Sequence, residues 1–283
     1  MKRTYDILIT AIAAVLLGGC AAELEDPEAA DDGAVLDHVE ALGFNPQEAK
    51  VIGDHVVVEG DIVFERQGLL RGEYEQFDAP EDSDLVEKGY RYPGLIAEKH
   101  RGNLRILFAS GAYAPSNEMR AAFLAAAKAW SEVPGSSIRI SPDNTGPAIV
   151  VRKVPVKNWA EYSGCEDADA CAYAPKNGRP GYDLFVREKS FDKGCTTWSP
   201  TGLAYLARHE LGHAIGFAHP KTAGSKHVSG TQKCSKANEA QCLKKNDYDT
   251  VMGAAVLKSS CVYSPARITK DDYATCTAVY PVK

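Results

Sequence analysis

The stretch that decides the fold is His209-Glu210-Leu211-Gly212-His213-Ala214-Ile215-Gly216-Phe217-Ala218-His219. At about 3.6 residues per turn, His209 and His213 lie one turn apart on the same face of a helix, so both imidazoles can reach one metal ion. If the helix continued, His219 would point roughly 240° away from His213. Because Gly216 can adopt the left-handed conformation, the sequence predicts that the helix ends there and that the chain returns with the third imidazole.

Three neutral imidazoles with an open fourth position are typical of a catalytic zinc site, whereas structural zinc sites are closed. The sequence therefore predicts one Zn²⁺ ion held by His209, His213 and His219. Glu210 flanks the ligand face, where it can act as general acid/base toward a water whose pKa zinc lowers to about 7. The alternatives are unrelated side chains on a surface helix, or a zinc site that has lost catalysis, but the intact Glu210 argues against the second.

The pattern H-E-x-x-H-x-x-G-x-x-H, filled at every specified position, resembles the zinc-binding consensus of metzincins. The chain looks most like bacterial HEIGH-type (dual-action HEIGH) metallopeptidases, and the resemblance extends over residues 104–283. It implies a zinc endopeptidase that acts on a peptide or protein substrate. It also implies that Met252, in Asp249-Thr250-Val251-Met252-Gly253, is the Met-turn residue beneath the metal, the alternative being a methionine that fills a gap in the core. Pro220 departs from the Glu of astacins and the Ser of many matrixins.

The resemblance implies an α+β fold, with a mixed twisted sheet and two long helices in an upper subdomain. An irregular lower subdomain would end in a C-terminal helix, and a small pro-segment would precede the domain. The local patterns agree with this order, because Ser116 and Ser199-Pro200 are typical of helix starts. By the same resemblance, residues 183–187 could form the edge strand that pairs with a substrate; an inner strand is the alternative. The expected strands are 104–109, 137–140, 148–151 and 181–187, and the expected helices are 116–132, one from 200 to Gly216, and 269–279.

The N-terminus is typical of an export signal. Lys2 and Arg3 precede an apolar run over residues 7–17, which ends in Leu17-Gly18-Gly19-Cys20. This resembles a bacterial lipoprotein, so residues 1–19 would be the signal peptide and Cys20 the lipidated first residue of a membrane-anchored protein. The expected location is the cell envelope, with the outer membrane favoured because Ala21 follows Cys20. Ordinary secretion after cleavage near Ala22 is the alternative.

Charge divides the rest of the chain. Residues 23–100 hold 21 acidic and 6 basic residues, a net charge of −15, whereas residues 101–283 hold 16 acidic and 24 basic, a net charge of +8. We expect residues 20–33 to be a disordered tether after the lipid, residues 34–100 an acidic pro-segment or inhibitory module, and residues 101–283 the peptidase domain. The module could instead be a permanent folding aid. The lysines are scattered and no nucleic-acid-binding motif accompanies them, so nucleic acid is not an expected partner.

Asp61 is the candidate for a latency ligand. Residues 56–64 read as a strand interrupted by Gly60, and they resemble the F-x-G-D motif of astacin pro-segments, with Val58 in place of the Phe. In those zymogens the aspartate binds the zinc and displaces the catalytic water, which implies the same role for Asp61. An ordinary turn aspartate beside a glycine is the alternative.

Eight cysteines with an export signal indicate disulfides. If Cys20 carries lipid, seven remain, and close spacing makes 165–171, 234–242 and 261–276 the simplest pairs, with Cys195 left over. No pattern indicates a structural Ca²⁺ site, and we expect a monomer. The competing function is an exported binding or adhesion protein whose zinc site is vestigial.

Overall fold

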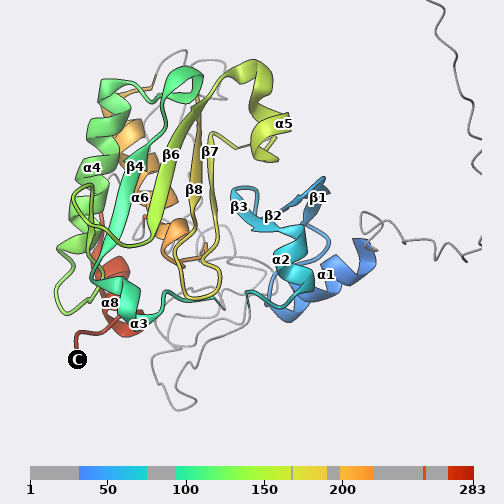
Figure 1. Cartoon of the computed structure of the whole chain (residues 1–283), viewed down its shortest axis with the longest axis horizontal. Helices are drawn as coiled ribbons and strands as arrows, with labels where there is room; N and C mark the ends of the chain where they lie inside the picture. The colour runs from blue at the N-terminus through green and yellow to red at the C-terminus, as the bar shows by residue number, and fades with distance from the viewer. Residues whose placement is uncertain (1–31, 75–93, 167, 190–197, 220–250, 253–266) are drawn as a thin grey trace, which may run out of the picture. The chain divides into compact units, whose positions relative to one another are not determined.

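The computed structural model describes residues 32–74, 94–166, 168–189, 198–219, 251–252 and 267–283. Helices and strands alternate irregularly around a mixed sheet, so the fold is α+β, as predicted (Figure 1). Its elements are α1 (Asp32–Ala41), β1 (Lys50–Ile52), β2 (His55–Val58), β3 (Ile62–Glu65), α2 (Arg66–Leu70), α3 (Glu98–Arg101), β4 (Leu104–Phe108), η3 (Gly111–Tyr113), α4 (Asn117–Ser131), β5 (Ile140–Ser141), β6 (Ala148–Val154), η4 (Val156–Asn158), α5 (Trp159–Ser163), β7 (Ala170–Tyr173), β8 (Asp183–Arg187), α6 (Pro200–Ala214) and α8 (Lys270–Val279).

The strands form one sheet of 8 strands in the order β1-β2-β3-β7-β8-β6-β4-β5. Strands β4, β5, β6 and β8 pair in parallel, β7 runs antiparallel to β8, and β3 lies parallel beside β7. Strands β1, β2 and β3 are joined as antiparallel hairpins. The sheet therefore continues from the half of the chain that contains the His209–His219 motif into its N-terminal part.

Of the two alternatives for residues 183–187, the edge strand is wrong and the inner strand is confirmed. Strand β8 is an inner strand, hydrogen-bonded to β6 on one side and to β7 on the other. Leu184, Phe185 and Val186 are all buried, which is the continuous apolar run expected of a strand covered on both faces. Strand β7 occupies the position beyond it, and β3 covers the outer side of β7.

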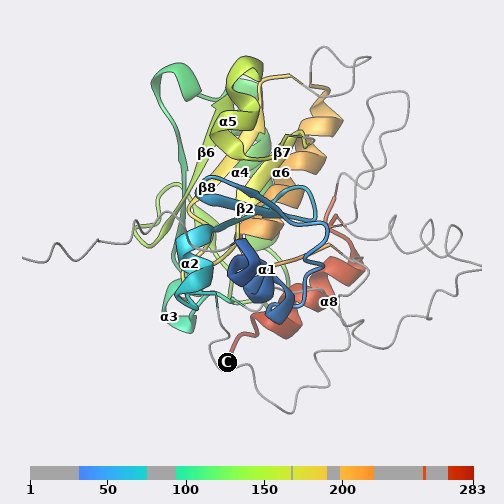
Figure 2. The same cartoon turned by 90° about the vertical axis from the view of Figure 1, so that its right-hand side faces the viewer.

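Helices α4 and α6 pack against each other and against the sheet (Figures 1 and 2). The predicted caps are present, because the hydroxyl of Ser116 accepts from the backbone N–H of Met119 and that of Ser199 from Gly202. The apolar stripe of α4 is buried, and it meets the inward side chains of the parallel strands. Residues of this core include Met119, Phe123, Trp130, Ile106, Ile149, Val151, Leu184, Leu206 and Leu211.

A second apolar cluster contains one disulfide. Cys165 and Cys171 are bonded, as predicted, and they pack with Trp159, Tyr173 and Phe185. Cys276 on α8 is a free, buried thiol in contact with Ser136 Oγ, which contradicts the predicted pairing with Cys261. The predicted 234–242 pair, Cys195 and Cys20 lie outside the described residues.

Residues 32–74, which we call the N-terminal module, contain α1, β1, β2, β3 and α2. The interrupted strand predicted over residues 56–64 is a hairpin, in which β2 turns into β3 through Glu59, Gly60 and Asp61. The module has its own apolar cluster, and Ala174 and Ala218 of the rest of the chain complete it. All described residues belong to one compact unit, Asp32–Lys283.

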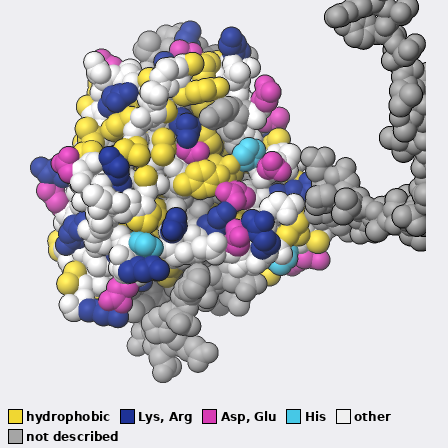
Figure 3. Space-filling model, in the orientation of Figure 1, with side chains coloured by type: hydrophobic (Ala, Val, Ile, Leu, Met, Phe, Trp, Pro, Cys, Tyr) yellow, Lys and Arg dark blue, Asp and Glu magenta, His cyan; other side chains and the backbone are white. Residues whose placement is uncertain are grey.

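The remaining predicted elements are found in part. Helix α8 matches the predicted C-terminal helix, whereas β5 shares only Ile140 with the strand expected over 137–140. Most of the predicted lower subdomain lies outside the described residues. No helix among the described residues is long and apolar enough to cross a membrane. On the face drawn in Figure 3, basic and acidic side chains are interspersed, and hydrophobic side chains gather over the upper part of the sheet.

Candidate metal centre

Helix α6 carries three of the residues predicted for the site. His209, Glu210 and His213 are all buried, and the Nε2 atoms of the two histidines lie 3.0 Å apart. This is the one-turn spacing expected from the sequence. The helix therefore presents two imidazoles to a single point.

Gly216 ends the helix region, as predicted. Its φ of 104° lies in the left-handed region, and its N–H donates to the carbonyl of His213, while the N–H of Phe217 donates to the carbonyl of Gly212. These two bonds form a Schellman motif. The chain then returns and brings the Nε2 of His219 to 3.0 Å from that of His209.

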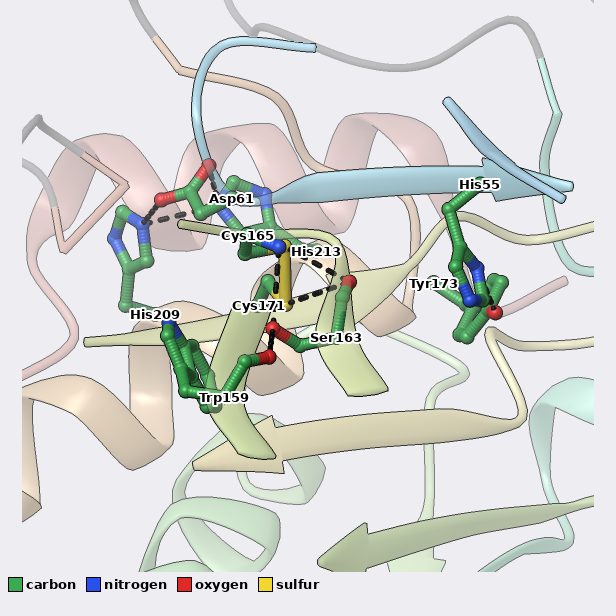
Figure 4. The surroundings of a disulfide bond; sticks show 9 residues. All are labelled: His55, Asp61, Trp159, Ser163, Cys165, Cys171, Tyr173, His209 and His213. Atoms are coloured by element: carbon green, nitrogen blue, oxygen red, sulfur yellow. Dashed lines mark hydrogen bonds and ion pairs between the residues drawn. A yellow bond between two sulfur atoms is a disulfide. The ribbon is translucent and has the colours of Figure 1, made fainter. Parts of the chain in front are cut away.

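Asp61 of the N-terminal module is the fourth member of the cluster. Its Oδ2 lies 3.2 Å from the Nε2 atoms of His209 and His219, and its Oδ1 lies 3.5 Å from that of His213. Figure 4 shows the carboxylate directed at His209 and His213. One ligand atom from each of the four residues lies within 4.8 Å of the others, so the set can hold one metal ion.

The hydrogen bonds of the Nδ1 atoms, the outer nitrogens that point away from the cluster, show which nitrogen of His209 and His213 faces the metal position. The Nδ1 of His209 lies 2.8 Å from the carbonyl of Val251, and that of His213 lies 2.7 Å from the carbonyl of Phe217. Because a carbonyl only accepts, both Nδ1 atoms carry the proton, and both Nε2 lone pairs converge. Converging lone pairs and a partly buried carboxylate fit a cation, and this donor set fits zinc.

The charges at the cluster agree with that donor set. Burial, helped by the neighbouring His213, lowers the pKa of His209 to about 4, so this imidazole is neutral. Burial raises the pKa of Asp61, but His219 and His213 outweigh it and hold the pKa well below its ordinary value. Burial lowers the pKa of His219, yet the Asp61 and Glu59 carboxylates raise it well above its ordinary value. These carboxylates therefore favour a cation at this point.

Glu210 has the environment of a proton acceptor. Its side chain is buried, and among the described residues its Oε2 has no hydrogen-bond partner. Burial and the negative charge of Asp61 raise the pKa of Glu210 well above its ordinary value. A carboxylate in this state takes up a proton more readily than an exposed one.

Met252 packs against helix α6, a position that fits both the Met-turn role and the alternative of a methionine filling a gap in the core. It is buried, and a Cβ added at Gly212 would lie 2.2 Å from its Sδ. Glycine at this position therefore allows the methionine to approach the helix one residue before His213. The sulfur packs directly against the backbone that carries the ligands.

Two residues of the site were not predicted. The carboxylate of Asp272 on α8 accepts from the N–H of Val251 at 3.0 Å, and it forms a capping box with Thr269. The pattern Thr269-x-x-Asp272 is a visible signal for the cap, but nothing in the sequence indicates that the same carboxylate holds Val251. Glu59 is the second, with an Oε2 atom 3.2 Å from the Nδ1 of His219.

No protein-family model matches the sequence, and no curated protein matches it. Among solved structures, two of myroilysin are similar. One is 16% identical over 65% of this chain and 95% of that chain, with a TM-score of 0.36. The other is 13% identical over 74% of this chain and 99% of that chain, with a TM-score of 0.33. High choriolytic enzyme 1, a hatching enzyme zinc-protease from Oryzias latipes (medaka), is 14% identical over 73% of this chain and 98% of that chain, with a TM-score of 0.37. Identity and TM-score are low in all three cases, so the functional argument rests on the residues of the site.

Proposed function

We propose that the chain is a zinc-dependent endopeptidase of metzincin type, related to the HEIGH-type enzymes by its motif. The observation that carries the proposal is the convergence of three imidazole Nε2 atoms, next in the chain to a buried Glu210 whose Oε2 has no hydrogen-bond partner among the described residues. His209, His213 and His219 would hold the zinc, and Met252 would support the helix beneath it. A zinc ion held there supplies Lewis-acid chemistry, which polarises a peptide carbonyl and acidifies water.

Glu210 is the proposed general acid/base. Its Oε2 would accept a proton from the attacking water and then donate it to the nitrogen of the leaving amine. The burial that raises its pKa lowers the cost of holding that proton. The substrate is therefore a peptide bond in a polypeptide.

Strand β7 is the proposed place for an extended substrate. In this structure its outer side pairs with β3 of the N-terminal module at Ile62↔Ala172 and Val63↔Tyr173. If β3 left, β7 would expose an edge next to the metal centre, where a peptide could add as a strand. This replaces the predicted role of residues 183–187.

The described arrangement is the proposed latent form, with residues 34–100 as pro-segment. Asp61 would be the fourth ligand of the metal ion, and β3 covers β7. Ion pairs from Lys176 to Glu65 and Glu73, and a 2.7 Å hydrogen bond between Tyr173 and His55, support the docking. A permanent folding role for the module remains the competing explanation, since three strands of the sheet belong to it.

We propose further that the chain is an exported lipoprotein. Residues 1–19 would be removed, Cys20 would carry the lipid, and residues 20–33 would link it to the folded part. Palmitate labelling of cells that express the wild type or Cys20→Ala tests this, because only the wild type should be labelled. An unlabelled wild type would contradict the proposal and favour ordinary secretion, whereas label on the variant would show that Cys20 is not the lipidated residue.

The enzymatic proposal is tested with full-length wild type, Asp61→Ala, and Asp61→Ala combined with Glu210→Ala. A peptide library reports cleavage, and elemental analysis reports bound zinc. We expect the double variant to bind zinc but not to cleave. Glu132→Ala, which changes an exposed carboxylate, is the matched control and should leave cleavage unchanged.

A binding protein with a vestigial zinc site is the second candidate. The observation that favours it is the carboxylate of Asp61, which closes the fourth position in the described arrangement. Absence of cleavage in all three proteins, with zinc bound in each, would support this candidate and overturn the enzymatic one.

A further inference from the structure

The three imidazoles differ in what holds their outer nitrogen. The Nδ1 atoms of His209 and His213 donate to carbonyls of Val251 and Phe217, which belong to the same half of the chain as the ligands. The Nδ1 of His219 lies 3.2 Å from Oε2 of Glu59, which belongs to the N-terminal module. Among the described residues, no other group is placed on this nitrogen.

Glu59 also holds the backbone of the third ligand. The same Oε2 atom accepts from the backbone N–H of His219 at 3.2 Å. The Glu59 side chain is only 3% exposed, so both contacts are shielded from water. One buried carboxylate therefore fixes the ring and the backbone of His219 together.

The backbone at Glu59 is in an unfavourable conformation. Its φ of 54° lies in the left-handed region, where residues other than glycine are rare, and the following Gly60 has a φ of 93°. Glycine would be less strained at position 59, so the glutamate stands there against the local backbone preference. Strained backbone of this kind clusters at functional sites.

We propose that Glu59 is a positioning residue through which the N-terminal module secures the third zinc ligand. This rests on the proposed function, because it takes His219 as a ligand. A carboxylate on the outer nitrogen fixes the ring orientation and makes the facing nitrogen a stronger ligand. One turn of the module would thus supply two carboxylates: Asp61 as a ligand at the metal position, and Glu59 as the partner of the outer nitrogen of His219. Zinc is then held more tightly while the module is docked than after it leaves.

The experiment measures zinc release from the full-length protein to a chromogenic chelator, for wild type, Glu59→Gln, Glu59→Ala and Glu59→Gly. Loss of an outer partner of a ligand typically weakens metal binding about 10- to 100-fold, and we expect faster release of that order for Ala and Gly. Gln keeps an acceptor oxygen without the charge, so its release should be intermediate. The absorption of Co²⁺-loaded protein should shift in the same order.

Glu59→Gly separates positioning from structural damage. Glycine relieves the strain at φ 54°, so the thermal midpoint of the zinc-free variant should not fall, although its zinc is released faster. Glu48→Gln is the matched control, because it changes an exposed carboxylate of the same module that takes no part in its docking contacts and leaves His219 untouched. Its zinc release should match the wild type.

Two results would overturn the inference while the zinc site stands: wild-type release rates in Glu59→Ala and Glu59→Gly, or release from Glu48→Gln as fast as from those two variants. A wild type that binds no zinc would instead overturn the proposed function, and the inference with it.

Discussion

The two ends of the eight-stranded sheet reach the metal centre in different ways. The part with α4 and α6 contributes imidazoles whose spacing is set by helix geometry, and two of them are locked by carbonyls of that same part. The N-terminal module contributes two carboxylates from one turn, held in place by strand pairing and by a few polar contacts. A ligand from a helix persists as long as the helix does, whereas a ligand from a docked turn is lost when the turn leaves.

Removal of a helix ligand should have the largest effect. His213→Ala leaves two imidazoles and a carboxylate, so we expect zinc affinity to fall by about three orders of magnitude or more, since a carboxylate cannot restore the lost imidazole. Titration against a competing chelator measures this. Wild-type affinity in the variant would show that the helix does not carry the metal.

Asp61→Ala should separate the contribution of the imidazoles to zinc binding from that of the module's carboxylate to latency. The three imidazoles remain, so zinc stays bound, while the fourth position opens and peptidase activity of the full-length chain rises. We expect a rise on the order of 100-fold, equivalent to about 2.7 kcal/mol of lost docking free energy. Asp54→Ala, in the preceding turn of the same module, is the control and should show no rise. If Asp61→Ala is no more active than the wild type, Asp61 is not a latency ligand.

Asp272→Ala tests the support of the helix side from α8. The variant leaves the buried N–H of Val251 without its acceptor and removes the capping box of α8, so we expect a loss of about 2 kcal/mol of unfolding free energy. Denaturant titration measures the loss. Asp143→Ala, at an exposed turn, should lie close to the wild type. A similar loss of unfolding free energy in both variants would contradict the role of Asp272 in holding Val251 and capping α8.

The smallest effect concerns pH at the docking contact between His55 and Tyr173. Burial lowers the pKa of His55 from its ordinary 6.5, although the Asp54 and Glu65 charges oppose the shift. The folded chain therefore prefers neutral His55, so this contribution is complete above about pH 6.5 and is lost as the pH falls below that value. The stability difference between wild type and His55→Gln, measured from pH 8 to pH 5, should shrink with acidification. A constant difference would contradict this reading.

Local patterns predicted the parts of the site that depend on local geometry. The spacing of His209 and His213, the cap at Ser199 and the turn at Gly216 all follow from interactions within a few residues. The order of the strands does not, because Leu184 to Val186 read as a buried strand without revealing which strands flank it. Glu59 and Asp272 were missed for the same reason, since their partners lie 160 and 21 residues away along the chain.

Parallel pairing of β3 with β7 has a consequence for how such an enzyme would switch on. A single cut in the backbone after Tyr74 would sever the covalent link, yet the hydrogen bonds between the strands and the salt links to Lys176 would remain. The cleaved protein would stay inactive until the fragment that ends at Tyr74 dissociates. Peptidase activity would then appear after a first-order lag set by dissociation of the fragment. Dilution would keep the fragment from binding again, and added fragment would restore the inhibition.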